Sequence, residues 1–289
     1  MPINESELIL NPDGSIYHLN LKPENVSKTI IFVGDPDRVD AISDRFDSIE
    51  FKTQKREFKT HTGTYKKKRV TVISTGIGPD NIDIVLNELD ALFNIDLTTK
   101  QIKEELTSLD IIRIGTSGSL QKDIPVDSFL ISTYGLDING MLQSYKIDTI
   151  SLSNIEDAFI EQTNWHEKKA RPVLIRASEK LKQKFESDKI HQGITATAGG
   201  FYGPQGRVLR LAIQDENLNS KMDTFNYNGH RITNLEMETS AIYGLSRLLG
   251  HHAISLNAII ANRASGVFSK NPHEIIENLI TYTLNKIVE

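Results

Sequence analysis

One arginine stands inside one of the most apolar stretches of the chain, in the run Ile111-Ile112-Arg113-Ile114. Because an unpaired buried charge is costly, Arg113 must meet either a carboxylate or a bound anion. The residues that follow, 115–118, add backbone amides and two hydroxyls at the end of a predicted strand, where open α/β sheets bind ligands. The pattern predicts an anion site, with a structural ion pair as the alternative.

A further anion-binding segment is Gly34-Asp35-Pro36-Asp37-Arg38, which follows another apolar run. Gly34 allows close approach of backbone to a ligand, and a helix N-terminus together with Arg38 attracts an anion. In the alternative, Asp35 or Asp37 only caps the helix and Arg38 is a solvated side chain.

Two carboxylates flank a methionine in Glu236-Met237-Glu238, directly before the helical pattern of residues 241–245. A carboxylate can accept two hydrogen bonds, which suits a vicinal diol such as that of a ribose. The alternative is that acidic residues simply favour a helix N-terminus.

The elements that must position these groups are predicted by apolar patterning. Near-continuous apolar runs, typical of strands buried on both faces, occupy residues 29–33, 70–73, 111–114, 129–132 and 258–261. Helical spacing of apolar residues covers residues 81–93 and 272–288. The chain, residues 1–289, is therefore predicted to be a single α/β domain with a central mixed β-sheet flanked by helices.

Two stretches lack this patterning. Residues 96–108 are polar and are expected to form a surface helix or loop, and residues 139–165 show no clear period and are expected to cross the surface.

Composition excludes several classes of function. With 33 Lys and Arg against 38 Asp and Glu, a net charge of −5 disfavours a nucleic-acid-binding face. The absence of cysteine excludes disulfides and thiolate chemistry and favours a cytoplasmic location. The acidic N-terminus does not resemble a signal peptide, and no stretch approaches the ~18 apolar residues of a membrane helix.

Common catalytic motifs are incomplete. Gly76-Ile77-Gly78 is followed by Asn81 where a dinucleotide fingerprint needs its third glycine. In residues 115–119, Ser119 replaces the last glycine of a nucleophile elbow. No P-loop and no His-Glu-x-x-His arrangement occurs, so no metal site is predicted.

Taken in order, several segments resemble the uridine phosphorylase branch of the nucleoside phosphorylase family. They span most of the chain: His18, residues 34–38, Arg56-Glu57-Phe58, residues 74–78, Arg113-Ile114-Gly115-Thr116, residues 201–207, Glu236-Met237-Glu238 and Asn262-Arg263. The resemblance implies a three-layer α/β/α fold and phosphorolysis, in which orthophosphate attacks C1′ of uridine and yields uracil and ribose 1-phosphate.

The resemblance also implies a role for each matching residue. Phosphate would be held by Gly34, Arg38, Arg113, Thr116 and the neighbouring subunit's Arg56. The ribose hydroxyls would be held by Glu236, Met237 and Glu238, and the 5′-hydroxyl by the neighbour's His18. The base would be held by Phe201, Tyr202, Gln205, Arg207 and Arg263. Arg113, Arg207, Gln205 and Glu238 would act most directly in catalysis. A homodimer would be the minimal active unit, with a hexamer of three dimers as a further assembly.

Departures from the family pattern define the alternatives. Residues 94–108 resemble a surface insertion, and Asn81 stands where a serine would ligate the monovalent cation that some relatives bind near Glu57 at the dimer interface. Apart from the co-substrate orthophosphate, no cofactor is implied, nor any nucleic acid or membrane partner. A purine or broad-range phosphorylase, a hydrolytic nucleosidase and a binding protein without turnover are the competing hypotheses.

Overall fold

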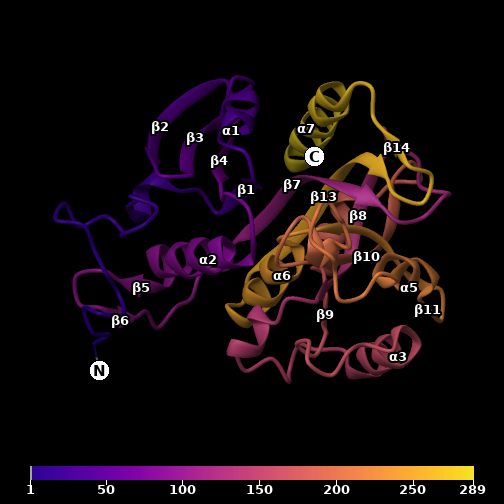
Figure 1. Cartoon of the computed structure of the whole chain (residues 1–289). Coiled ribbons are helices and arrows are strands. Elements are labelled where there is room, and N and C mark those ends of the chain that lie inside the picture. The colour runs from indigo at the N-terminus through magenta and orange to yellow at the C-terminus, as the bar shows by residue number, and fades with distance from the viewer. Residues whose placement is uncertain (1) are drawn as a thin grey trace.

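The computed structural model describes residues 2–289, in which one large mixed sheet carries most of the strands (Figure 1). Its strands are β1 (Thr29–Val33), β2 (Ser48–Lys55), β3 (Phe58–Tyr65), β4 (Lys68–Ser74), β7 (Asp110–Ser119), β8 (Phe129–Asp137), β9 (Val173–Arg176), β10 (His191–Thr197), β11 (Asn226–Tyr227), β12 (His230–Glu236), β13 (His252–Asn262) and β14 (Val267–Phe268). The predicted single-domain α/β fold with a central mixed sheet is confirmed, and each predicted strand lies within an observed one.

The longer helices cover this sheet. They are α1 (Pro36–Ser43), α2 (Pro79–Asn94), α3 (Ser153–Thr163), α4 (Glu179–Phe185), α5 (Leu218–Thr224), α6 (Thr239–Leu248) and α7 (Pro272–Val288), with short 3-10 turns at Pro23–Asn25, Met141–Ser144 and Gly203–Gln205. In Figure 1, α7 lies above β7 and β13, whereas α2 and α6 lie side by side below them. Both helices predicted from apolar spacing, 81–93 and 272–288, are confirmed as α2 and α7.

Part of the sheet closes on itself. β12 pairs with β10 in parallel and also with β7 in antiparallel, where Asn234 faces Ser119 and Leu235 faces Gly118. Together with the β7–β13, β13–β8 and β8–β10 pairings, this contact completes a ring of strands inside the predicted layered fold. The contact brings the end of β7 against the end of β12.

The two unpatterned stretches differ from expectation. Residues 96–108 were expected to form a surface helix or loop. They form a loop that includes most of a small hairpin, β5 (Ile95–Asp96) and β6 (Gln101–Ile102), so the helix alternative was wrong. The hairpin turns tightly because Asp96 Oδ1 accepts the backbone N–H groups of Thr98 and Thr99, at 2.8 and 2.9 Å. Residues 139–165 include the regular helix α3. Its buried face was hidden from apolar patterning because Glu156 and Thr163 lie on it.

No helix among residues 2–289 combines the length and apolar character needed to cross a membrane.

Candidate active site

A cavity of about 500 Å³ opens where β1, β7 and β12 end. Of the residues singled out by sequence, its walls bring together Gly34, Arg38, Arg113, Thr116, Phe201, Gln205, Arg207, Glu236, Met237 and Glu238. These residues are separated by up to 204 positions in the chain, so the fold, not local sequence, assembles the site. His18, Arg56, Tyr202 and Arg263 do not line this cavity.

The first wall is the turn from β1 into α1. Asp35 is the N-cap of α1, since its side chain accepts the backbone N–H of Asp37 at 3.0 Å. Arg38 reaches across to β7 and donates to the carbonyl of Ile114 at 3.2 Å. Burial lowers the pKa of Arg38, and repulsion from Arg113 lowers it further. The attraction of Asp35 opposes this shift without cancelling it. The cap predicted at Asp35 is confirmed, whereas Arg38 lies against the end of β7 and is not a solvated side chain.

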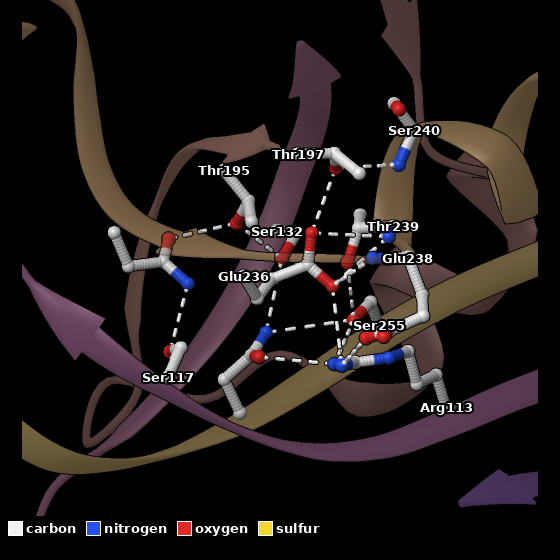
Figure 2. A network of polar contacts seen from close by, with 12 residues as sticks. Arg113, Ser117, Ser132, Thr195, Thr197, Glu236, Glu238, Thr239, Ser240 and Ser255 are labelled. Atoms are coloured by element: carbon white, nitrogen blue, oxygen red, sulfur yellow. Dashed lines mark hydrogen bonds and ion pairs between the residues drawn. The ribbon is translucent and has the colours of Figure 1, made fainter. Parts of the chain in front are cut away.

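Arg113 is the most buried cation of the site, with 7% of the residue exposed. Its Nη2 contacts Glu238 Oε2 at 2.5 Å and Glu236 Oε2 at 3.1 Å, while its Nη1 donates to Asn257 Oδ1 at 3.1 Å (Figure 2). Burial acts to lower the pKa of Arg113, but the two carboxylates outweigh it and the pKa is raised. Of the two partners expected for Arg113, a carboxylate or a bound anion, the structure shows the carboxylates, and anion binding at Arg113 stays a prediction.

Close approach of the guanidinium depends on Gly115. A Cβ atom at that position would lie 1.9 Å from Arg113 Nη1. Any side chain at position 115 would therefore displace the guanidinium from its carboxylate partners.

The two carboxylates of Glu236-Met237-Glu238 have different surroundings. Glu236 accepts the Thr197 hydroxyl at 2.7 Å and the backbone N–H groups of Glu238 and Thr239, each at 2.9 Å (Figure 2). Its oxygens thus hold the turn that starts α6. The helix-start interpretation describes Glu236, although this side chain also faces Arg113.

Glu238 is the carboxylate with capacity left for a ligand. Its Oε1 accepts the Gly78 N–H at 2.8 Å and its Oε2 contacts Arg113. Burial raises the pKa of Glu238, and Glu236 adds to the shift, whereas Arg113 opposes it. An acceptor of this kind, poised between a cation and open cavity, can exchange its partner for ligand hydroxyls.

The cavity is also lined by an amide and a guanidinium, those of Gln205 and Arg207. Gln205 is 2% exposed, and its Oε1 accepts Arg207 Nη1 at 2.5 Å. The Arg207 guanidinium lies over the Phe201 ring, 3.8 Å from its centroid. Arg263 lies behind this pair and donates to the Gln205 carbonyl at 2.6 Å. Burial, followed by repulsion from Arg207, lowers the pKa of Arg263 to about 10.

Tyr202 takes a different place from the one expected. It lines a neighbouring cavity of about 720 Å³ that shares Arg207 and is walled by exposed leucines, Leu209 and Leu211. Its ring packs edge-to-face on Phe201 at 5.2 Å. Tyr202 therefore supports Phe201 from outside and does not wall the candidate active site directly.

Two of the four predicted residues outside the cavity, His18 and Arg56, are the ones expected to serve a neighbouring subunit. His18 pairs with Glu88 through Nδ1, and Arg56 is exposed in the turn between β2 and β3. Their contribution to a neighbouring subunit stays a prediction.

Sequence reasoning missed the polar side chains of β13. Asn257 and Ser255 are fully buried, and both accept hydrogen bonds from Arg113 Nη1. From there a polar network runs through Ser132 and Thr195 toward Ser117 (Figure 2). The available signal was the one used for Arg113, namely polar residues inside an apolar strand.

No cluster of three or more His, Asp or Glu within residues 2–289 is arranged to hold a metal ion. Glu57 and Asn81 are the positions that the resemblance relates to an interfacial cation. Both side chains lie against Gly76. A Cβ atom added at Gly76 would be 2.9 Å from Glu57 Cγ and 2.5 Å from Asn81 Nδ2.

An α/β fold whose sheet ends in a cationic pocket, a buried carboxylate and an amide–guanidinium pair defines a site for an anion together with a polar, hydroxylated ligand. The chain belongs to the phosphorylase superfamily, whose model matches residues 28–283.

Individual relatives agree with this assignment. The chain is 29% identical over 265 residues to the uridine phosphorylase of Thermococcus kodakarensis, covering 89% of this chain and 81% of that protein. It is 27% identical over 242 residues to a DeoD-type purine nucleoside phosphorylase of Geobacillus stearothermophilus, with 83% of each chain covered. The crystal structure of a Trypanosoma brucei nucleoside phosphorylase, described as showing uridine phosphorylase activity, superimposes with a TM-score of 0.87 at 31% identity, covering 97% of this chain and 99% of that one.

Proposed function

We infer that this protein is a uridine phosphorylase, which uses orthophosphate to convert uridine into uracil and ribose 1-phosphate in pyrimidine salvage. The observation that carries the inference is that one cavity is lined by three kinds of group. They are the cations Arg38 and Arg113, the carboxylate of Glu238, and the amide–guanidinium pair of Gln205 and Arg207. These groups suit the phosphate, the ribose and the base of a nucleoside phosphorolysis.

The residues suit the charges that the reaction develops. Breaking the glycosidic bond leaves positive character on the ribose and negative charge on the departing uracil. Phosphate held by Arg38, Arg113 and Thr116 would stabilise the ribose and attack C1′, while Arg207 and Gln205 would stabilise the uracil anion. Glu238 and Met237, on a turn shaped by Glu236, would hold the ribose hydroxyls.

Base choice follows from the same groups. Gln205 and Arg207 together offer an amide and a guanidinium to the O4, N3 and O2 edge of uracil, whereas cytosine presents an amino group and an unprotonated N3 there. Arg263 would position this pair through the Gln205 carbonyl. The 29% identity to a uridine phosphorylase and the 31% identity to a nucleoside phosphorylase described as showing uridine phosphorylase activity support the pyrimidine assignment.

The proposal includes an assembly. Arg56 and His18 lie outside their own chain's cavity, which supports a homodimer as the minimal active unit, with a hexamer of such dimers as the larger form. All 289 residues act as one domain, with 94–108 as a surface insertion. The absence of cysteine supports a cytoplasmic location. Orthophosphate is the co-substrate, and we propose no further cofactor; the resemblance leaves room for a monovalent cation at the dimer interface.

Phosphate dependence tests the reaction class. Uridine incubated with the enzyme is expected to release uracil only when orthophosphate is present, together with one equivalent of ribose 1-phosphate. Chromatography of both products provides the measurement, with inosine as a parallel substrate. Equal uracil release without phosphate would instead identify a nucleosidase, and faster turnover of inosine would identify a purine phosphorylase.

A Gln205→Ala variant tests the base-reading end. We expect kcat/KM for uridine to fall roughly tenfold, because a buried hydrogen-bonding partner of the uracil edge is lost. Binding of ribose 1-phosphate, measured by calorimetry, should change little, since that product does not reach Gln205. The exposed Gln183→Ala on α4 is the matched control. Equal losses for both ligands would contradict the assignment of Gln205.

A further inference from the structure

The loop that carries His18 is fixed in the core yet leaves the imidazole accessible. Ile16, Leu19 and Leu21 are at most 1% exposed, and Asn11 Nδ2 donates to the carbonyl of Ile16 at 2.9 Å. The His18 side chain, between these anchors, is 27% exposed. The loop therefore presents one imidazole on a rigid backbone.

A single carboxylate, Glu88 of α2, holds this imidazole. Its Oε2 accepts the backbone N–H of Leu19 at 2.9 Å, and both of its oxygens lie 3.0 Å from the backbone nitrogen of His18. Its Oε1 lies 2.6 Å from His18 Nδ1. With 13% of its side chain exposed, Glu88 is enclosed by the groups that it binds.

These contacts select one form of the ring. A carboxylate that accepts backbone N–H groups is an acceptor only, so the short contact requires the proton to reside on Nδ1. In the neutral imidazole, Nε2 is then an unprotonated acceptor. Among residues 2–289, no group is hydrogen-bonded to His18 Nε2, so this lone pair is available to a ligand.

We propose that Glu88 is a positioning residue that holds His18 in the Nδ1-protonated tautomer, so that Nε2 accepts a hydrogen bond from the 5′-hydroxyl of a ribonucleoside bound to a second copy of the chain. This inference rests on the proposed function and on the resemblance, which already implies that the neighbour's His18 binds the ribose 5′-hydroxyl; the new element is the role of Glu88. The tautomer that Glu88 fixes adds a requirement on the substrate, because an acceptor at Nε2 recognises only a 5′ group that donates. Nucleosides without a 5′ donor lose this contact.

Substrate discrimination provides the first test. The ratio of kcat/KM for uridine to that for 5′-deoxyuridine is measured in wild type, His18→Ala and Glu88→Gln. His18→Ala should remove most of the wild-type preference for uridine. Glu88→Gln should lower that preference roughly tenfold and leave turnover of 5′-deoxyuridine within about twofold of wild type. Asp90→Asn on the same helix, which faces His251, is the matched control and should keep the ratio.

Two outcomes of this assay would overturn the proposal. Equal losses for both substrates in Glu88→Gln would make Glu88 a structural residue only. An unchanged preference in His18→Ala would remove His18 from recognition of the 5′-hydroxyl.

The ring nitrogens give a second test that needs no turnover. In ¹⁵N-histidine-labelled wild type, the His18 signals, assigned by their loss in His18→Ala, should show protonated Nδ1 and bare Nε2 at alkaline pH. Glu88→Gln should shift them toward the other tautomer. Protonated Nε2 in wild type would refute the proposal. Wild type that shows the expected tautomer but releases no uracil would refute the proposed function and the 5′-hydroxyl assignment, while supporting the Glu88–His18 pairing.

Discussion

Arg113→Ala is expected to lower kcat/KM for phosphorolysis of uridine by about 10²- to 10³-fold, the range seen when one preorganised donor to a reacting anion is removed. Arg113 is buried, lines the cavity and contacts Glu238, so water cannot replace its charge in the same geometry. The loss should appear mainly as a lower kcat/KM for phosphate. Steady-state kinetics with phosphate varied at saturating uridine measure it.

Two controls separate charge from geometry. Arg113→Lys keeps a cation but loses the planar fork that contacts Glu238 and Asn257 together, so it should recover only part of the activity. Arg231→Ala removes a partly exposed arginine paired with Asp123 and should leave kinetics unchanged. Wild-type kcat/KM in Arg113→Ala would assign Arg113 to a purely structural role.

The same variant should lose stability in a pH-dependent way. Without Arg113, Glu236 and Glu238 remain buried without their cation, which costs about 3–5 kcal/mol in the free energy of unfolding. Burial already raises the pKa of Glu238 in wild type, and Arg113 is the group that counteracts it. Its removal raises that pKa further, so the deficit should be small in acid, where the carboxyl is protonated, and grow as pH rises. Denaturant unfolding at pH 5 and pH 8 should show the difference.

The sequence predicted features correctly where the signal lies in a residue and its immediate neighbours, such as a charged residue within an apolar run. Arg113 could be assigned a buried charged partner because Ile111, Ile112 and Ile114 surround it, and the start of a helix at Asp35 or Asp37 could be assigned from the Asp and Pro residues after an apolar run. The same local rules predicted α2 and α7 from apolar spacing. In each case the signal lies within a few residues.

Features that depend on long-range contacts could not be predicted this way. Glu236 and Glu238 look equivalent in sequence. In the fold, however, the hydroxyl of Thr197 on β10 donates to Glu236, whereas the backbone N–H of Gly78 before α2 donates to Glu238. The pairing of β12 with β7 likewise depends on how two distant strands bend toward one another. Glu88 is an unremarkable helical glutamate until the fold places it 2.6 Å from His18 Nδ1.

Because Glu236 and Glu238 have different partners, we predict that Glu238→Gln weakens catalysis with uridine but strengthens the binding of phosphate. Glu238→Gln should lower kcat/KM for uridine about 10²-fold, because a charged acceptor for two ribose hydroxyls is replaced by a weaker one. Phosphate should bind more tightly to the same variant, roughly tenfold, since Arg113 is no longer neutralised by Glu238 and a like charge near the anion is removed. Uridine kinetics and calorimetric titration with phosphate measure the two effects separately.

Glu236→Gln is the matched variant, because it changes the same functional group two residues away. Its amide can accept fewer of the N–H and hydroxyl donors that now converge on Glu236, so the start of α6 should loosen and the midpoint of thermal unfolding should fall. The Glu238 side chain accepts no N–H group of α6, so the Glu238 variant should lose less stability and more activity. Weaker phosphate binding in Glu238→Gln would contradict the competition for Arg113, since the arginine would then need Glu238 to hold it in place for the anion.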